Sequence, residues 1–393
     1  MEDDGSVVVK VNTWWSRENL GGDRVRLHET QWVTMRPDGG RWVNGAPSSV
    51  ENELMQVGNM EVIAGKSGPA AATGGVGPFK FLSLLGDERS VVRRWSSVSF
   101  NDGRDEVTLY HPTFTAGNKI MRPGLKFKVD GTGMEKLNFV SLMLALFCGT
   151  AALPHILIRY YTVRSTADAR KSTIVAIAAI GFFYILTLYM GLGAMTNGVI
   201  NLQDNNMSGP LLARSFGTFL FAVISAIAFA TVLGTVSGLI VAASGAVAHD
   251  FLDRFAGLRY TEKQKVYAGR IAAFSVGLIA IILGIVFKGM NVSYLVGWAF
   301  AVAASANLPA IIMLLFWKKT TAKGIVASIM IGSTAALGII LLSPSMWGRY
   351  GLDPANAPIP FSNPGIISIP LSFLTLVIVS LVTQKKEGET ASA

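Results

Sequence analysis

The 393-residue sequence has little charge and almost no cysteine, and each shortage excludes a class of protein. Charged residues make up 15% of the chain, against roughly 25% in soluble proteins. The single cysteine, Cys148, excludes a disulfide framework and a cysteine-based zinc site. Hydrophobic residues reach 51%, so the composition favours a membrane protein over a soluble enzyme.

The charges are distributed unevenly along the chain. Residues 1–136 carry 17 Lys and Arg and 17 Asp and Glu, whereas residues 137–393 carry 17 and 8, so the net charge of +9 belongs to the apolar part. We therefore expect a polar domain at 1–136 and a seven-helix transmembrane domain at 137–393. Because the polar domain is neutral, the positive charge does not indicate a nucleic-acid partner.

Seven apolar runs are long enough to cross a hydrocarbon core of about 30 Å. None has Asp, Glu or Lys at its centre, and Gly, Ala and Ser are scattered among the larger apolar residues, as in helices that pack within a lipid bilayer. We predict that all seven span the membrane. They lie near residues 137–161, 172–194, 215–248, 271–287, 292–317, 324–343 and 365–382.

The basic residues near the span ends predict an orientation. Alternate loops and the C-terminal tail hold 14 of the 17 basic residues in the apolar part, and the opposite loops hold only Arg214, Lys288 and Arg349. Because loops rich in Lys and Arg stay in the cytoplasm, we expect a cytoplasmic C-terminus and a polar domain outside the cell (inner) membrane. Residues 1–30 contain no apolar stretch that would start export, so we expect upstream helices of the same protein.

Residues 1–136 have the pattern of short strands and turns. Residues 7–11, 25–33 and 107–110 alternate or are β-branched, between clusters of Gly, Pro, Asn and Asp. Five of the eight tryptophans lie in this part and predict a small aromatic core. His28 and His111 lack the spacing of metal ligands, so we expect no metal site.

The spans offer interrupted helices rather than catalytic groups. The eight acids of residues 137–393 lie in loops, at span ends or in the tail, which disfavours an enzyme or a carboxylate proton relay. In the first span, Pro154 lacks an amide proton and clashes with the carbonyl of Thr150, beside Gly149, so the helix should bend or break. Backbone groups freed in this way line a cavity or bind a solute. The alternative is a packing kink, with His155 as a core hydrogen-bond donor.

Two further spans contain polar groups, and each group can be interpreted in two ways. In the third span, the Thr231 carbonyl and the Thr235 hydroxyl share a helix face and suit a sodium ion, but Gly234 and Gly238 also form a small-residue packing pattern. In the fifth span, residues 305–309 (SANLP) place an Asn and a Pro inside the membrane, which predicts either a gating kink or an interhelical hydrogen bond.

The motifs in these spans resemble one family. The sequence GTAALPH at 149–155, followed by RYYTV at 159–163 and ARK at 169–171, resembles a signature of the sodium:solute symporter family, specifically its cation/acetate permease branch. The stretches AFATVL at 228–233, AASGAVAHD at 242–250 and AFAVAASANLP at 299–309 resemble further helices of that branch.

The resemblance implies a fold and a set of site residues. The fold would be an all-α membrane protein made of two inverted five-helix repeats; this chain would be the second half plus two extra helices, with an N-terminal β-rich polar domain as an insertion. The resemblance places Gly149, Thr150, Pro154 and His155 near the solute. It places Thr231 and Thr235 at a sodium site, where Gly234 lacks the usual hydroxyl.

The expected function follows from that resemblance. It is symport of acetate or a similar short-chain monocarboxylate by alternating access, with sodium as the coupling ion and with neither a cofactor nor catalytic residues. The alternative is a truncated chain that transports nothing and serves as a membrane-anchored interaction or sensory module through its outer domain.

Overall fold

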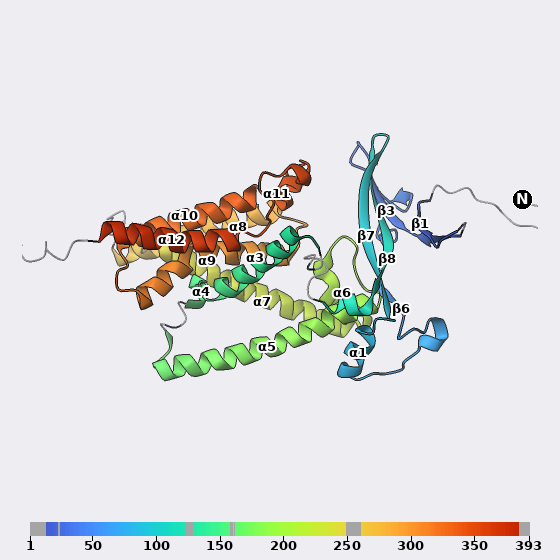
Figure 1. Cartoon of the computed structure of the whole chain (residues 1–393), viewed down its shortest axis with the longest axis horizontal. Helices are drawn as coiled ribbons and strands as arrows, with labels where there is room; N and C mark the ends of the chain where they lie inside the picture. The colour runs from blue at the N-terminus through green and yellow to red at the C-terminus, as the bar shows by residue number, and fades with distance from the viewer. Residues whose placement is uncertain are drawn as a thin grey trace, which may run out of the picture. The chain divides into compact units, whose positions relative to one another are not determined.

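The structure is a computed structural model, which describes residues 13–22, 24–122, 129, 131–157, 160, 162–248 and 261–384 (Figure 1). The chain forms two compact units, one from residues 1–123 and 178–228 and the other from residues 124–177 and 229–393. The predicted domain boundary after residue 136 rests on the change in amino-acid composition, and it stays a prediction. The predicted strand at 7–11 lies outside the described residues.

The first unit is built around a long β-hairpin. Strands β7 (Val91–Asp102) and β8 (Asp105–Ala116) pair along their whole length. Their two-residue turn contains Gly103, whose φ of 65° lies in the left-handed region that favours glycine. The hairpin is the centre of a six-stranded antiparallel sheet in the order β5-β4-β3-β8-β7-β6. The remaining strands are β1 (Trp15–Asn19), β2 (Val25–Glu29), β3 (Gln31–Met35), β4 (Arg41–Val43), β5 (Ala46–Pro47) and β6 (Asn59–Val62).

The β-rich character of the polar part is confirmed, with one change of boundary. The predicted strand at 107–110 lies within β8. The predicted strand at 25–33 divides at Thr30 into β2 and β3, because β2 pairs with β1 in a separate two-stranded sheet, whereas β3 pairs with β4 and β8. The aromatic core is smaller than expected: Trp32 is buried and Trp95 packs against the core, but Trp14 and Trp15 are exposed.

Helical segments complete the first unit. Helix α1 (Pro78–Leu85) contributes Leu85 to a cluster with Val92 and Leu192, and Val57 and Ile200 exchange two backbone hydrogen bonds of 3.0 and 2.9 Å. Gly217 has a φ of 128° and precedes the third span, whose helical segment runs from Thr218 to Ala248, so the span predicted at 215–248 begins three residues later than expected. The helices before and after this glycine are α6 (Ser208–Ser215) and α7 (Thr218–Gly245). Other short helices are η1 (Gly68–Ala71), α2 (Gly117–Ile120) and η3 (Asn205–Met207).

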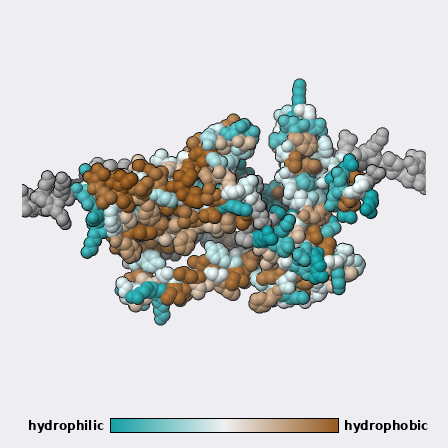
Figure 2. All heavy atoms as spheres, in the orientation of Figure 1, coloured by the Kyte–Doolittle hydropathy of each residue, from teal (hydrophilic) through white to brown (hydrophobic). Residues whose placement is uncertain are grey.

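The second unit is a helix bundle packed through small residues. Helices α3, α9, α10 and α12 lie against one another, and the surface over α10 and α12 is largely apolar in Figure 2. A Cβ added at Gly324 or Gly332 would overlap atoms of α12, and Ser328 and Ser372 join α10 to α12 with a 2.9 Å hydrogen bond. Such small residues let membrane helices approach closely. The bounds are α3 (Gly133–Thr150), α4 (Pro154–Leu157), α8 (Glu262–Val286), α9 (Val292–Phe316), α10 (Ala322–Leu341), α11 (Pro344–Arg349), η5 (Pro354–Asn356) and α12 (Gly365–Thr383).

Seven helical segments among the described residues are long and apolar enough to cross a membrane, as predicted. Four begin earlier than their apolar runs, and capping boxes start two of these: Thr132 and Glu135 cap α3, and Thr261 and Gln264 cap α8. The most apolar 18-residue stretches of α5 (Thr166–Thr196) and α7 contain no buried residue. The seven segments are Gly133–Leu157, Thr166–Thr196, Thr218–Ala248, Lys263–Val286, Val292–Phe316, Ala322–Leu341 and Gly365–Thr383.

Candidate functional site

The first span is broken at the position that the sequence predicts. Helix α3 ends at Thr150, and Pro154 is the first residue of α4, a position where the missing amide proton costs nothing. Between them, Ala152 and Leu153 are buried, at 0% and 9% exposure. The break is therefore buried at Ala152 and Leu153, whereas Ala151 and the flanking Thr150 and Pro154 are exposed.

The break removes carbonyl groups from the helical hydrogen-bond ladder. In a continuous helix the Ala152 carbonyl would accept from the amide of Ile156, but that amide donates to the Leu153 carbonyl at 3.1 Å instead. The Ala152 carbonyl accepts from the side-chain Nδ2 of Asn307 in α9, at 3.0 Å. A buried polar group of the break is thus satisfied by a neighbouring helix.

The four predicted solute-site residues lie in different environments. Gly149 is buried at the contact with α9, where an added Cβ would lie 2.5 Å from the Phe300 Cβ and 2.7 Å from its carbonyl oxygen. The Thr150 side chain is exposed, and its hydroxyl donates back to the carbonyls of its own helix turn. Pro154 is exposed and His155 is half-buried. The role of all four in solute binding stays a prediction.

The two predicted sodium ligands lie together on α7. The Thr235 hydroxyl is 3.0 Å from the Thr231 carbonyl and donates to it, so the two oxygens share a point on one helix face. Both residues are exposed, and among the described residues no atom apart from the adjacent backbone of α7 lies within 4 Å of a Cβ added at Gly234. The structure brings the two oxygens together, and their binding of sodium stays a prediction.

The fifth span is not interrupted. Helix α9 runs from Val292 to Phe316 with Pro309 inside it, and Asn307 makes the interhelical hydrogen bond that is one of the two predicted alternatives; the gating kink stays a prediction. The sequence singles out Asn307 but does not identify its acceptor, because Ala152 lies 155 positions away.

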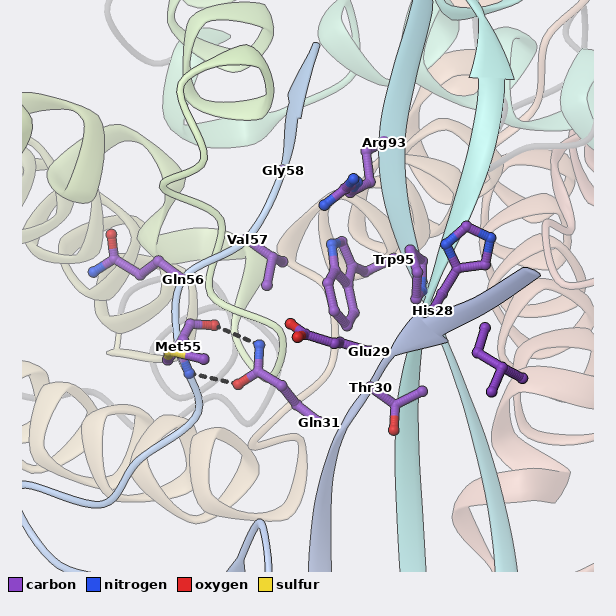
Figure 3. A pocket seen from close by; sticks show the side chains of 12 residues that line it. His28, Glu29, Thr30, Gln31, Met55, Gln56, Val57, Gly58, Arg93 and Trp95 are labelled. Carbon is purple, nitrogen blue, oxygen red and sulfur yellow. Dashed lines mark hydrogen bonds between the residues drawn. The ribbon is translucent and has the colours of Figure 1, made fainter. Parts of the chain in front are cut away.

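The first unit contains a cavity of about 490 Å³ beside β2, β3 and β7 (Figure 3). Gln31 closes one wall through two hydrogen bonds with the backbone of Met55, of 3.2 and 2.6 Å. Within the described part of the chain, Arg93 Nε and Trp95 Nε1 are buried without a hydrogen-bond partner. The remaining lining residues are Leu27, His28, Glu29, Thr30, Gln56, Val57, Gly58 and Pro112.

The charges around this cavity do not favour an anion. Arg93 already pairs with Glu61 at 2.6 Å, so its positive charge is neutralised, and the Glu29 carboxylate adds a negative charge to the wall. Because an isolated carboxylate needs a compensating positive charge when it leaves water, this cavity is a poor site for a monocarboxylate. We therefore place the candidate solute site at the α3–α4 break.

The ion pair between Arg41 and Glu53 in the first unit is structural. Arg41 binds Glu53 through two hydrogen bonds of 2.7 and 2.8 Å, and it also donates to Gln203 at 3.0 Å. The hydrogen bonds from Arg41 and Ser48 lower the pKa of Glu53 to about 2. Burial raises the pKa of the nearby Tyr110 hydroxyl. These groups tie β4 to the segment after α5, and among the described residues no three His, Cys, Asp or Glu side chains gather to hold a metal.

Comparison with known proteins places the chain in a class. The sequence profile of the sodium:solute symporter family matches residues 104–332, so the chain belongs to the sodium:solute symporter family. It is a multi-pass membrane protein, and the family to which it belongs consists of transporters rather than enzymes.

Two curated relatives are similar over most of the chain. An uncharacterized symporter of Bacillus subtilis, YwcA, is 43% identical over 279 residues, which are 69% of this chain and 53% of the relative. A monocarboxylic acid transporter of Corynebacterium glutamicum is 45% identical over 286 residues, 70% of this chain and 50% of the relative. The chain thus spans about half the length of these relatives. No solved structure gives a significant match.

Proposed function

We propose that this chain serves the cation-coupled symport of acetate or a similar short-chain monocarboxylate, by alternating access across the cell membrane. The observation that carries the proposal is the break between α3 and α4, at which Ala152 and Leu153 are buried. Interrupted helices with freed backbone groups are where transporters of this general design bind small solutes. The similarity to a monocarboxylic acid transporter supports a carboxylate as the solute.

The solute would bind to backbone groups of the break. Gly149, Thr150, Pro154 and His155 surround it in sequence, and the short helix α4 presents its N-terminal end there. Freed backbone groups of the break would hold the carboxylate, and no acidic residue lies in the sequence between Glu135 and Asp168 to repel it. The wider fold would be two inverted five-helix repeats, of which this chain supplies the second repeat and two extra helices.

Sodium is the coupling ion that we propose. The Thr231 carbonyl and the Thr235 hydroxyl offer two neutral oxygens at one point, and neutral oxygen ligands suit a hard monovalent cation. To coordinate a cation, the Thr235 hydroxyl would turn its proton away from the Thr231 carbonyl. Gly234 leaves open space where the family resemblance implies a second hydroxyl, so we expect weak sodium binding.

The charge pattern supports an orientation for this protein. With 14 of 17 basic residues of the apolar part in one set of loops and the tail, the C-terminus would lie in the cytoplasm and the polar domain outside the inner membrane. One sodium ion entering with one carboxylate moves no net charge. Each additional cation would add about 2.3 kcal/mol of driving force per 100 mV of membrane potential.

The test is uptake of labelled acetate by cells that express the full-length protein, with and without sodium. We expect sodium-dependent uptake that unlabelled propionate and pyruvate inhibit. Thr235→Val removes one proposed ligand and should raise the sodium concentration for half-maximal uptake about tenfold or more, since hydrogen bonds to charged groups contribute about 1.5–3 kcal/mol.

The matched control for this variant is Thr187→Val. Thr187 lies on α5, is also exposed and also donates to its own helix, at 2.9 Å from the Tyr184 carbonyl. It should leave the sodium dependence unchanged. Uptake without sodium dependence would exclude sodium as the coupling ion, and no uptake of any monocarboxylate would exclude the proposed substrate class.

A further inference from the structure

We propose that Asn307 is a positioning residue for the solute site: its side-chain amide holds the α3–α4 break in the shape that binds solute, through the carbonyl of Ala152. The inference rests on the proposed function, because it takes the break as the solute site. Asn307 lies in α9, and its Nδ2 is 3.0 Å from the Ala152 oxygen.

The geometry of the break makes this hydrogen bond necessary. Ala152 is 0% exposed, so water is not there to satisfy its freed carbonyl. The amide of Ile156, the ordinary partner of the Ala152 carbonyl, is used by Leu153. Without the Asn307 amide the Ala152 carbonyl would lose the partner that the structure gives it, and the break would change conformation to recover one.

A second contact on the same face of α9 holds the helix before the break. Phe300 and Asn307 are seven residues apart, which is two helical turns, so both project from one face of α9. The backbone of α3 meets Phe300 at Gly149, where a Cβ would lie 2.8 Å from the Phe300 Cα. Helix α9 therefore contacts the chain on both sides of Thr150: at Gly149 by close packing and at Ala152 by a hydrogen bond.

The opposite side of this segment of α9 is tied to the rest of the bundle. The buried Ser305 hydroxyl lies 2.7 Å from the Ser368 hydroxyl of α12, and its carbonyl faces Gly332 of α10. Contacts with α10 and α12 thus fix the position of Asn307. Its hydrogen bond to the Ala152 carbonyl in turn fixes the position of the break. A shift of α9 relative to α3 must break this hydrogen bond, so Asn307 also couples the helix arrangement to the solute site.

The test compares three variants of the full-length protein. Asn307→Leu keeps the size of the side chain and removes the donor. Asn307→Asp keeps the shape and donates only when its carboxyl is protonated. Asn291→Ala is the matched control: Asn291 caps the same helix through a 3.0 Å hydrogen bond to the Ser293 amide and does not touch the break. Detergent extraction and size-exclusion chromatography check that each variant folds.

Two readouts separate positioning from general stability. The first is the KM and maximal rate of acetate uptake. The second is the rate at which N-ethylmaleimide labels Cys148, one residue before Gly149 and half-buried at the end of α3, measured by mass spectrometry of the labelled peptide. The labelling needs no transport, so it reports the shape of the break even in a protein that takes up no acetate.

We expect Asn307→Leu to raise the KM about tenfold and to change the Cys148 labelling rate, because a buried carbonyl loses its partner. Asn291→Ala should change neither the KM nor the labelling rate by more than about twofold, because losing a helix cap lowers the stability of the helix without altering the break. Uptake by Asn307→Asp, relative to wild type, should rise as the pH falls, because the protonated carboxyl donates to Ala152 and the carboxylate repels its carbonyl.

The outcomes separate this inference from the proposed function. Altered Cys148 labelling in Asn307→Leu, together with no monocarboxylate uptake by the wild type, would support the positioning role and overturn the proposed substrate. A wild-type KM and a wild-type labelling rate in Asn307→Leu would overturn the positioning role. So would an Asn307→Asp variant that stays at the level of Asn307→Leu at every pH.

Discussion

Gly149→Ala should destabilise the protein, although alanine is the better helix former. The added Cβ would lie 2.5, 2.7 and 2.8 Å from the Cβ, carbonyl oxygen and Cα of Phe300. Carbon atoms in contact prefer about 3.5–4.0 Å, so α3 must move about 1 Å away from α9. Such a shift would also stretch the 3.0 Å hydrogen bond between Asn307 and Ala152.

The magnitude follows from three opposing contributions. Overpacking costs about 1–3 kcal/mol. Weakening a hydrogen bond to a buried carbonyl costs about 1–3 kcal/mol at most. Replacing Gly by Ala in a helix gains about 1 kcal/mol. The net effect is a loss of about 1–5 kcal/mol, which should lower the apparent Tm of the purified full-length protein by several degrees and raise the KM for the solute.

A second substitution sharpens this prediction. Phe300→Ala shortens the side chain but leaves the Cβ, Cα and carbonyl that the new methyl group meets, so it should not rescue Gly149→Ala. Gly338→Ala in α10 is the matched control, because nothing lies within 4 Å of its added Cβ, and its Tm should be unchanged or higher. A Gly149→Ala protein as stable as the wild type, or one rescued by Phe300→Ala, would refute the backbone contact between α3 and α9.

Two further predictions concern groups away from the break. Arg41 and Ser48 lower the pKa of Glu53 to about 2, so the stabilisation from this pair is complete above pH 4.5 and is lost as the pH falls toward 2. Glu53→Gln should remove this pH dependence, which hydrogen exchange of the β4 backbone amides measures. The stabilisation lost should be less than about 1 kcal/mol, because the pair is partly exposed. Asn138 Oδ1 accepts from both the backbone and side-chain nitrogens of Asn363, so Asn138→Ala should cost about 1–3 kcal/mol in thermal unfolding, unlike Asn356→Ala at an exposed site.

The sequence is most informative where the signal is local. The seven spans follow from length and hydropathy, and the break follows from one proline, whose effect on the chain reaches only four residues back. The helix starts differ from the apolar runs because capping is polar: Thr132 and Thr261 begin helices with residues that hydropathy does not count. Gly217, with its φ of 128°, likewise moves the start of the third span from residue 215 to Thr218.

The sequence is least informative about which groups meet across the fold. The sequence suggests only that Gly149 is a flexible residue next to Thr150. The structure places it in a close helix contact with Phe300, which is 151 positions away in the sequence. The acceptor of the Asn307 amide is equally remote. Periodicity identifies which residues share a face, and only the packing of α3 against α9 determines what that face meets.

The two prolines at 154 and 309 show why one helix breaks and the other does not. At Pro154 the amides of Ile156 and Leu157 both turn to the Leu153 carbonyl, so a new helix begins and the carbonyls before it need partners elsewhere. At Pro309 the freed carbonyl belongs to Ser305, and it faces the backbone of Gly332 in an adjacent helix. Helix α9 can therefore continue through its proline, and it keeps Asn307 in register with the break in α3. A positioning contact requires a donor on a continuous helix and an acceptor at a break. Asn307 of α9 and the Ala152 carbonyl meet these two requirements.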